Sequence, residues 1–220
     1  MLSEQKNFLF VHIPKTGGNS IQSILRDYSE DAIVINSPIQ DGVERFGILN
    51  QKYGFNKHTP LSQYKKLLPP DLYTRLFKFA CLRNPWDMMI SYYFSPHRNV
   101  HGWDRNNFIG LLRSTPTMAS FITLAPGPEG GKNLPLDRDI DFLMRLETIN
   151  DDFKKACDRI GIPARDLPIR NRSNRQPYSC YYDNELIEMV AEKFRAEINY
   201  GGYRFAGPCP RAGVKSYPAT

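Results

Sequence analysis

The sequence lacks the patterns that mark several common classes of protein. No apolar run reaches the ~18 residues that a membrane-spanning helix needs, and there is no internal repeat. No basic run, zinc-ligand spacing or recognition helix indicates binding to nucleic acid. No aspartate-rich magnesium pattern follows an apolar strand, and no CxxC pair indicates a zinc ribbon. We therefore expect a soluble globular protein that does not bind nucleic acid.

Two further absences bear on the cellular compartment. Residues 1–7 lead directly into the first apolar run, without space for a secretion signal. Free thiols are expected for the cysteines of a chain without such a signal, and these residues are widely spaced: Cys81, Cys157, Cys180 and Cys209. A cytoplasmic protein is therefore the prediction.

Length and composition suit a single domain. The 220 residues, 41% of them hydrophobic, can fill one large α/β core. We expect one domain over residues 1–220, with its core at about 7–205 and a disordered Gly- and Pro-rich tail at 206–220. The net charge of +6 favours polyanionic ligands, although Lys and Arg scattered over a solvated surface are the commoner cause of a modest excess. The sequence does not reveal the oligomeric state.

The chain is organised around a strand, a glycine turn and a helix start. Residues 8–13 form a short, almost wholly apolar run, as in a buried parallel strand. Two adjacent glycines then allow positive φ and close approach of backbone N–H groups to phosphate-like oxygens. A helix over residues 21–26, with Asn19 or Ser20 as its N-cap, would point its positive dipole end at the same oxygens. The predicted anion site consists of Lys15, Thr16, Gly17, Gly18, Asn19 and Ser20.

This motif has an alternative interpretation and a clear difference from a known pattern. An ordinary βα turn with a surface lysine would have the same residues. In the nucleotide-kinase P-loop, GxxxxGK[ST], the lysine follows the last glycine, whereas Lys15 precedes Gly17 and Gly18.

A second anion-binding motif follows a later apolar run at residues 76–82. That strand delivers Arg83, whose guanidinium can clamp a phosphate with two hydrogen bonds. Pro85 and Asp87 suit the first turn of the next helix. Ser91 lies about two helical turns further on, where its hydroxyl can reach the same phosphate. Alternatively, Arg83 pairs with Asp87, and Ser91 faces a neighbouring helix.

Together the two motifs resemble those of the sulfotransferases that use 3′-phosphoadenosine 5′-phosphosulfate (PAPS), in particular the branch with the carbohydrate sulfotransferases, in a soluble, bacterial type. The resemblance covers about residues 7–205. It implies a single α/β domain with a central parallel sheet flanked by helices, built like the P-loop nucleotide kinases. It also implies transfer of a sulfuryl group from PAPS to a hydroxyl acceptor, without a metal and with PAP as the product.

The same resemblance implies roles for residues of both motifs. The first motif would bind the 5′-phosphosulfate, with Lys15 also catalytic, and Arg83 and Ser91 would bind the 3′-phosphate. A late basic loop, residues 168–177, would close over the nucleotide through Arg175, for which simple surface charge is an equally good explanation. A glycan is the expected acceptor class, although small alcohols, phenols and sulfated lipids cannot be ranked against it.

His58 is the predicted catalytic base. An alcohol attacks sulfur poorly unless its proton is removed, and an imidazole suits that task near neutral pH. His58 precedes a helix over residues 61–68, for which Thr59 is a plausible cap and Pro60 the first residue. A capping or exposed loop histidine is the alternative, and His12 is a rival base for which burial at the end of the first strand is expected.

The remaining elements follow from periodicity and turn residues. We expect a second strand at residues 31–36, closing a βαβ unit with the first, and mostly loop at 37–55. Two short helices at 106–124 are split at Pro116, and one amphipathic helix covers 183–198. A strand at 141–146 precedes a helix that ends near Gly161, with Arg145 and Glu147 in structural roles. The loop at 125–135 would border the acceptor site.

Two other functions compete with sulfuryl transfer. A P-loop kinase of a small molecule or nucleoside would need a lysine after the glycines and a carboxylate at a strand end for magnesium. A noncatalytic module with the same fold would bind sulfated or phosphorylated glycans without turning them over.

Overall fold

The computed structural model describes residues 1–124, 135–168, 175–207 and 209. Its centre is a four-stranded sheet with the order β1-β2-β5-β6. The strands are β1 (Leu2–Ser3), β2 (Phe8–Val11), β5 (Phe77–Leu82) and β6 (Phe142–Arg145). β2, β5 and β6 run parallel, whereas β1 pairs with β2 in the antiparallel direction. The predicted α/β class with helices around a central sheet is thus confirmed, but the sheet is mixed rather than wholly parallel.

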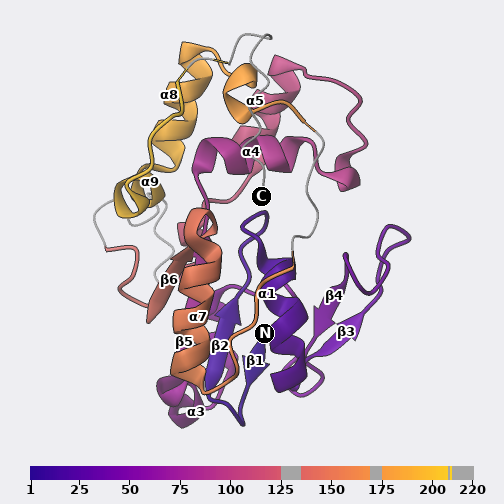
Figure 1. Ribbon diagram of the computed structural model, residues 1–220, viewed down its shortest axis with the longest axis vertical. Coiled ribbons are helices and arrows are strands. Elements are labelled where there is room, and N and C mark those ends of the chain that lie inside the picture. Colours follow the sequence, from indigo (N-terminus) through magenta and orange to yellow (C-terminus); the bar gives the residue numbers. More distant parts are fainter. Residues whose placement is uncertain (125–134, 169–174, 208, 210–220) are drawn as a thin grey trace.

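Both faces of the sheet are covered, which explains why β2 is wholly apolar and β5 is apolar except for Lys78. Alternate residues enter two separate cores, because successive side chains of a strand point to opposite faces. Phe8 and Phe10 pack in the core that contains residues of α1 (Gly18–Leu25) and α7 (Ile149–Ile160), the two helices that lie over the sheet in Figure 1. Leu9 and Val11 pack in the other core, with residues of the helices described next.

The second core is built by helices that belong mostly to the upper part of Figure 1. Their bounds are α2 (Leu61–Leu67), α3 (Pro70–Arg75), α4 (Pro85–Tyr93), α5 (Arg105–Ser114), α6 (Ala119–Ile122), α8 (Asn184–Lys193) and α9 (Arg195–Gly201). Short 3-10 helices occur at η1 (Arg26–Tyr28), η2 (Pro96–Arg98), η3 (Leu146–Thr148) and η4 (Tyr178–Tyr181). The two helices around Pro116 are confirmed, whereas the helix predicted over 183–198 is divided between α8 and α9 at Phe194.

The segment after α1 does not form the βαβ unit that the sequence predicts. β3 (Ala32–Val34) pairs in the antiparallel direction with β4 (Gly47–Leu49), in a separate two-stranded sheet at the right of Figure 1. The predicted loop at 37–55 therefore contains a strand. β3 is half-buried rather than apolar and enclosed, so it suits a small sheet at the side better than the buried centre of the main sheet.

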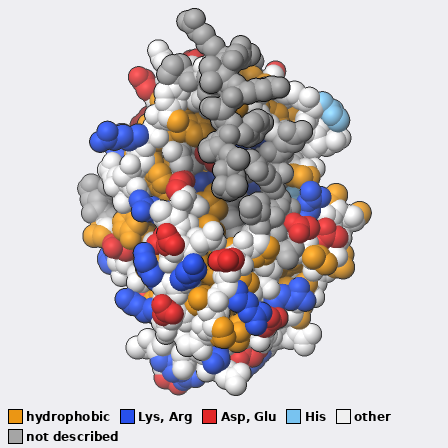
Figure 2. Space-filling view, viewed as in Figure 1, with side chains coloured by type: hydrophobic (Ala, Val, Ile, Leu, Met, Phe, Trp, Pro, Cys, Tyr) orange, Lys and Arg blue, Asp and Glu red, His pale blue; other side chains and the backbone are white. Residues whose placement is uncertain are grey.

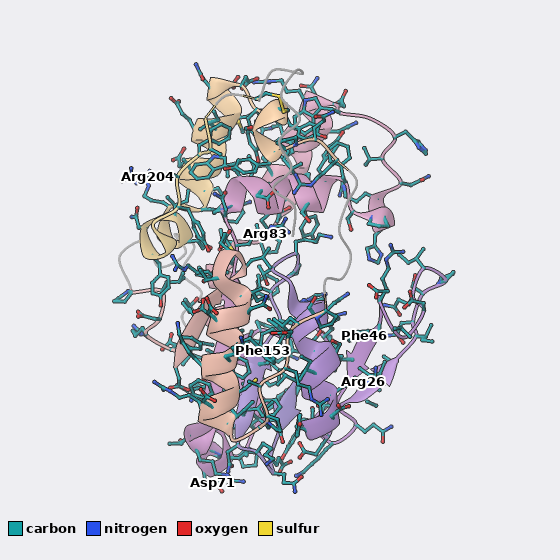
Figure 3. All side chains as sticks on the ribbon, viewed as in Figure 1. Arg26, Phe46, Asp71, Arg83, Phe153 and Arg204 are labelled. Atoms are coloured by element: carbon teal, nitrogen blue, oxygen red, sulfur yellow. A yellow bond between two sulfur atoms is a disulfide. The ribbon has the colours of Figure 1, made fainter. Side chains whose placement is uncertain are left out.

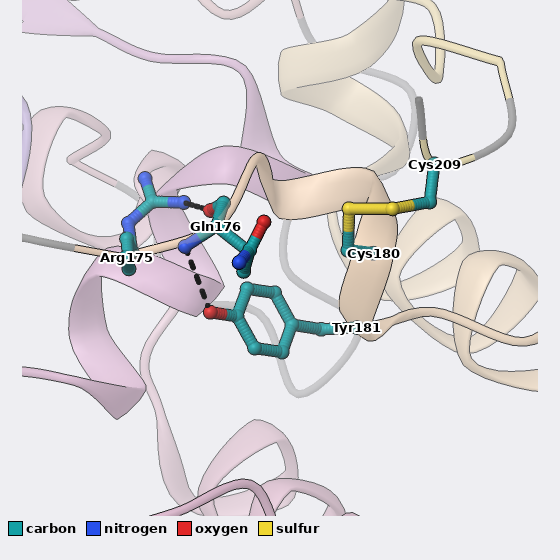
Figure 4. The surroundings of a disulfide bond; sticks show 5 residues. All are labelled: Arg175, Gln176, Cys180, Tyr181 and Cys209. Carbon is teal, nitrogen blue, oxygen red and sulfur yellow. Dashed lines mark hydrogen bonds between the residues drawn. A yellow bond between two sulfur atoms is a disulfide. The ribbon is translucent and has the colours of Figure 1, made fainter. Parts of the chain in front are cut away.

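The cysteines also differ from the prediction. Cys180 and Cys209 form a disulfide, drawn in Figure 4, that ties the end of the described chain to η4. Cys81 and Cys157 are free, as expected, and both are buried. No helix in the described part of the chain is long and apolar enough to cross a membrane. The acceptor-site loop at 125–134 and most of the predicted disordered tail (208 and 210–220) lie outside the described residues.

Candidate functional site

The two predicted motifs meet at one edge of the main sheet. Because β2 and β5 are parallel neighbours, the loops after their carboxyl ends lie side by side. A hydrogen bond joins the loops directly: Arg83 Nη1 donates to the backbone oxygen of Lys15 at 2.8 Å. Figure 3 labels Arg83 between α4 and the end of the sheet. The structure thus brings together two segments that are 68 residues apart in the sequence.

The first loop adopts the tight backbone that its glycines suggest. Lys15 has φ 68° and Gly17 has φ 86°, so two positions in a row of three are left-handed. A Cβ atom on Gly18 would lie 2.0 Å from His12 Cδ2, which leaves no room for a side chain there. Alternating left-handed residues of this kind turn successive N–H groups toward one point, the geometry of an anion-binding nest.

The N-cap prediction for α1 is wrong. Gly17 is the N-cap and no side chain caps the helix. Asn19 lies inside the first turn, where its Nδ2 donates to the backbone oxygen of Glu44 at 2.9 Å. The free N–H groups of the first turn are therefore left without side-chain acceptors in the described chain, as they would be in a site that receives an anion.

Thr16 supports the loop from within. Its side chain is buried and donates to the backbone oxygen of Ile13 at 2.9 Å. The hydroxyl hydrogen is therefore already used, and Thr16 can offer a ligand its backbone N–H.

Lys15 carries a charge in surroundings that oppose it. Its pKa is lowered to about 8, first by burial and then by the positive charges of Arg83, Arg175 and Arg45. Every residue whose charge shifts this pKa is itself a cation. A bound anion would remove the conflict, because an opposite charge within a few ångströms favours the charged form of lysine.

Asp87 is the counter-charge to the arginines of the site. Arg83 donates to Asp87 Oδ2 from Nε at 2.9 Å and from Nη2 at 2.6 Å, and Arg175 Nη2 donates to Asp87 Oδ1. Burial raises the pKa of Asp87, but the charges of Arg83 and Arg175 outweigh it and hold that pKa below its usual value. The Arg83–Asp87 pair that the sequence left open is thus present.

The ion pair with Asp87 leaves N–H groups of the Arg83 guanidinium for other partners. Within the described chain, the bonds to Asp87 and Lys15 use three N–H groups of Arg83, and a guanidinium has about five. Ser91, which is 8% exposed, lies one turn beyond Asp87 on the same side of α4. Arg83, Asp87, Ser91 and Arg175 therefore surround one patch beside Lys15.

His58 lies in an exposed turn before α2, with its ring beside that of His12. The ring centroids of the two histidines are 4.7 Å apart, and His58 Nδ1 is 3.3 Å from the backbone oxygen of His12. Because a carbonyl oxygen only accepts, Nδ1 carries the hydrogen in this contact and Nε2 keeps its lone pair. The pKa of His58 is lowered to about 4, mainly by burial of the ring. The hydrogen bond to His12 raises this pKa, and the charge of Lys57 lowers it.

The turn before α2 holds His58 in place. Asn56 Oδ1 accepts from the His58 backbone N–H at 3.0 Å, and Thr59 Oγ1 accepts from the Asn56 backbone N–H at 2.9 Å. Thr59 therefore closes this turn, and Pro60, not Thr59, is the N-cap of α2. His12 is buried, its Nδ1 has no partner in the described chain, and burial keeps its pKa well below the usual value.

An apolar cavity of about 220 Å³ opens beside His58. It is bounded by the loop after β2, by α4 and by the connection from α5 into α6. Its lining residues are Ile13, Pro14, His58, Met88, Tyr92, Thr115, Pro116, Met118 and Phe121. The sequence did not indicate this cavity, because its walls come from four separate segments.

Two cations near the site were also missed. Lys57 donates to the backbone oxygen of Phe46 at 2.6 Å, and burial lowers its pKa to about 8. Arg45 acts on the pKa of both Lys15 and His97. Nothing in the local sequence marks either residue except that Lys57 precedes His58. On the face shown in Figure 2, by contrast, Lys and Arg alternate with Asp and Glu over the lower half.

Glu147 has the structural role that the sequence predicts. It accepts from the backbone N–H of Asn84 at 2.7 Å and from the Tyr203 hydroxyl at 3.3 Å. Asn84 in turn caps α4 by accepting from the backbone N–H groups of Trp86 and Asp87. Glu147 thus fixes the turn between Arg83 and α4.

Comparisons with known proteins identify no relative. No family model matches the chain, and neither a search of curated proteins nor a search of solved structures found a match. The function must therefore be inferred from the site itself.

Proposed function

We propose that the protein transfers a sulfuryl group from PAPS to a hydroxyl acceptor. The observation that carries the proposal is the junction of the two loops, where half-buried Lys15 and Arg83 lie together at a left-handed glycine turn. Cations and free N–H groups at this density suit a ligand with several negative charges. A nucleotide with a phosphosulfate at one end and a phosphate at the other has that charge distribution.

The reaction is a displacement at sulfur. The acceptor oxygen forms a bond to sulfur while the bond from sulfur to the bridging phosphate oxygen breaks, and the electron pair of that bond remains on PAP. Lys15 and the backbone N–H groups of the turn stabilise the charge that develops on the phosphate oxygen. His58 Nε2, the nitrogen with the free lone pair, takes the proton of the acceptor.

The second loop fixes the far end of the nucleotide. Arg83 has N–H groups left for the 3′-phosphate, and Ser91 lies on the same side of α4. Arg175, held by Asp87, adds a third donor to that phosphate. Holding both ends aligns the sulfur with the acceptor, which lowers the entropic part of the barrier.

Turnover with labelled PAPS and a panel of sugars, phenols and aliphatic alcohols tests the proposal. We expect Lys15→Ala and His58→Ala to lower kcat by about 10²-fold or more, whereas the exposed His101→Ala should retain the wild-type rate. Calorimetry with PAP and with ATP plus magnesium separates sulfuryl transfer from kinase activity. Tighter binding of ATP, or wild-type rates in both site variants, would contradict the proposal.

A further inference from the structure

The cavity beside His58 lies where an acceptor would have to bind. Ile13 and Pro14, which line it, directly precede Lys15 in the loop after β2, and His58 lines it as well. A molecule in the cavity therefore lies next to both the proposed base and the loop proposed to hold the sulfuryl group. The chemistry of the cavity wall then limits which acceptors fit.

The wall offers few hydrogen bonds. Thr115 already donates its hydroxyl hydrogen to the backbone oxygen of Leu111 at 2.8 Å, and His58 Nδ1 is engaged with His12. Apart from His58 Nε2, the Tyr92 hydroxyl and the Thr115 oxygen, which can still accept a hydrogen bond, the described lining side chains present carbon and sulfur atoms. A sugar ring carries several hydroxyl groups, and each one buried without a partner costs about 1–3 kcal/mol.

The size of the cavity is equally restrictive. An apolar cavity of about 150 Å³ is large enough for benzene, and this one measures about 220 Å³. One six-membered ring with a short substituent fits, whereas a disaccharide does not. Met88 and Met118 can adjust to the shape of such a ring, since methionine is flexible and polarisable.

We propose that the acceptor is a small apolar alcohol or phenol with a single hydroxyl group, rather than a carbohydrate. Its hydroxyl points to His58, and its hydrocarbon part lies against Met88, Met118 and Phe121. This inference rests on the proposed sulfuryl transfer and replaces the glycan acceptor that the family resemblance implies. An apolar acceptor in the cavity would also shield the exposed His58 from water, which could otherwise compete as an acceptor.

Binding to the PAP-loaded protein tests the inference without depending on turnover. We expect calorimetry to show binding of 4-methylphenol or cyclohexylmethanol at least tenfold tighter than binding of glucose or N-acetylglucosamine. Phe121→Ala should weaken phenol binding by about tenfold, through the loss of apolar contact worth about 1.4 kcal/mol, and Phe121→Leu by less. Ile35→Ala, at an exposed position directly after β3, is the matched control and should have no effect.

Each outcome has a distinct meaning. Tighter binding of the sugars than of the phenols would overturn the acceptor inference, as would unchanged phenol binding in Phe121→Ala, and either result leaves PAP binding and sulfuryl transfer intact. Failure of the wild-type protein to bind PAP would instead overturn the proposed function, and the acceptor inference with it. Measuring PAP affinity for Phe121→Ala first verifies that the variant is folded.

Discussion

At the scale of single residues, Lys15 shows most clearly how the site differs from ordinary surface. A half-buried lysine surrounded by other cations destabilises the free protein, because its charged form has lost part of its hydration and gained only repulsion. A fold keeps such a group when a ligand of opposite charge compensates it. Lys15 is therefore expected to oppose stability and support binding at the same time.

Replacing Lys15 by methionine should reverse these two effects. We expect Lys15→Met to raise the free energy of unfolding of the ligand-free protein at pH 7 by about 1–3 kcal/mol, the order of magnitude of the lowered pKa. The same variant should lose most of the stabilisation that PAP gives the wild-type protein. Urea unfolding with and without PAP measures both quantities. If the variant is less stable than the wild-type protein without PAP, the charge of Lys15 does not destabilise the free protein.

The lowered pKa of Lys15 also predicts how binding depends on pH. Below about pH 8 the free protein has Lys15 charged, and PAP binds without taking up a proton. Above that pH the free protein has lost the proton, so binding must restore it, and the affinity should fall by up to about tenfold per pH unit. Lys15→Arg stays charged throughout and should show a flat profile. Calorimetry between pH 6 and 10 distinguishes the two.

The lowered pKa of Lys15 also predicts the direction in which stability changes with pH. Its folded-state pKa lies below the unfolded-state value, so between about pH 8 and 10.5 the unfolded chain binds more protons than the folded one. The contribution of Lys15 to stability should therefore rise through that interval. Below pH 8 both states are charged, and the full cost of burial remains.

The residue scale also shows what local sequence can predict. Lys15, Gly17 and Arg83 could be found because each belongs to a short pattern that follows an apolar strand. Arg45 and Lys57 could not, because they reach the site through space from a segment with no such pattern. The sequence indicated that Arg83 could pair with Asp87, but it did not show whether Arg83 pairs with Asp87 or binds a ligand. A spacing of four residues allows both.

At the scale of secondary structure, the outcome depends on element length. β2, which is wholly apolar, and β5, which is apolar except for Lys78, were predicted. β1 has two residues and β4 three, too few for any periodicity to appear. The pairing of β3 with β4 instead of the main sheet is set by tertiary packing. The boundary between α8 and α9 was missed because the apolar periodicity continues across Phe194.

The start of α1 provides the sharpest test at this scale. A Cβ on Gly18 would meet His12 at 2.0 Å, and His12 is itself buried. We expect Gly18→Ala to lower the free energy of unfolding by about 1–3 kcal/mol or more and to weaken PAP binding, because the loop must shift. Thermal unfolding and calorimetry measure the two effects.

Gly110 is the matched control for that substitution. It is also a helical glycine, on α5, but an added Cβ would meet no heavy atom within 4 Å. Gly110→Ala should therefore stabilise the protein by about 0.5–1 kcal/mol through helix propensity. Equal effects of the two substitutions would mean that the close contact between α1 and His12 does not control the loop.

At the scale of the whole molecule, the site lies where the two cores meet the end of the sheet. The core over α1 and α7 supports the loop of Lys15, and the core under α4 supports Arg83 and the apolar cavity. The sequence could predict a central sheet with helices around it, but not which cysteines pair, because spacing alone does not fix a distance in space. The Cys180–Cys209 bond joins η4, three residues after Arg175, to the end of the described chain.

The disulfide should therefore contribute to both stability and nucleotide binding. Its sequence separation of 29 residues corresponds to about 3–4 kcal/mol of loop-closure entropy, an upper estimate. Cys209→Ser should lower the free energy of unfolding by up to that amount, and a reductant should affect the wild-type protein but not the variant. Urea unfolding with and without reductant measures the effect.

A double-mutant cycle then decides whether the bond acts on binding through Arg175. The disulfide anchors the segment from which Arg175 reaches Asp87, as Figure 4 shows for Arg175 and Cys180. Loss of the bond should weaken PAP binding in the wild-type background, but not in Arg175→Ala, where the donor is already absent. Equal losses in both backgrounds would show that the disulfide stabilises the fold without positioning Arg175. That result would remove Arg175 from the nucleotide site while leaving the roles of Lys15 and Arg83 unchanged.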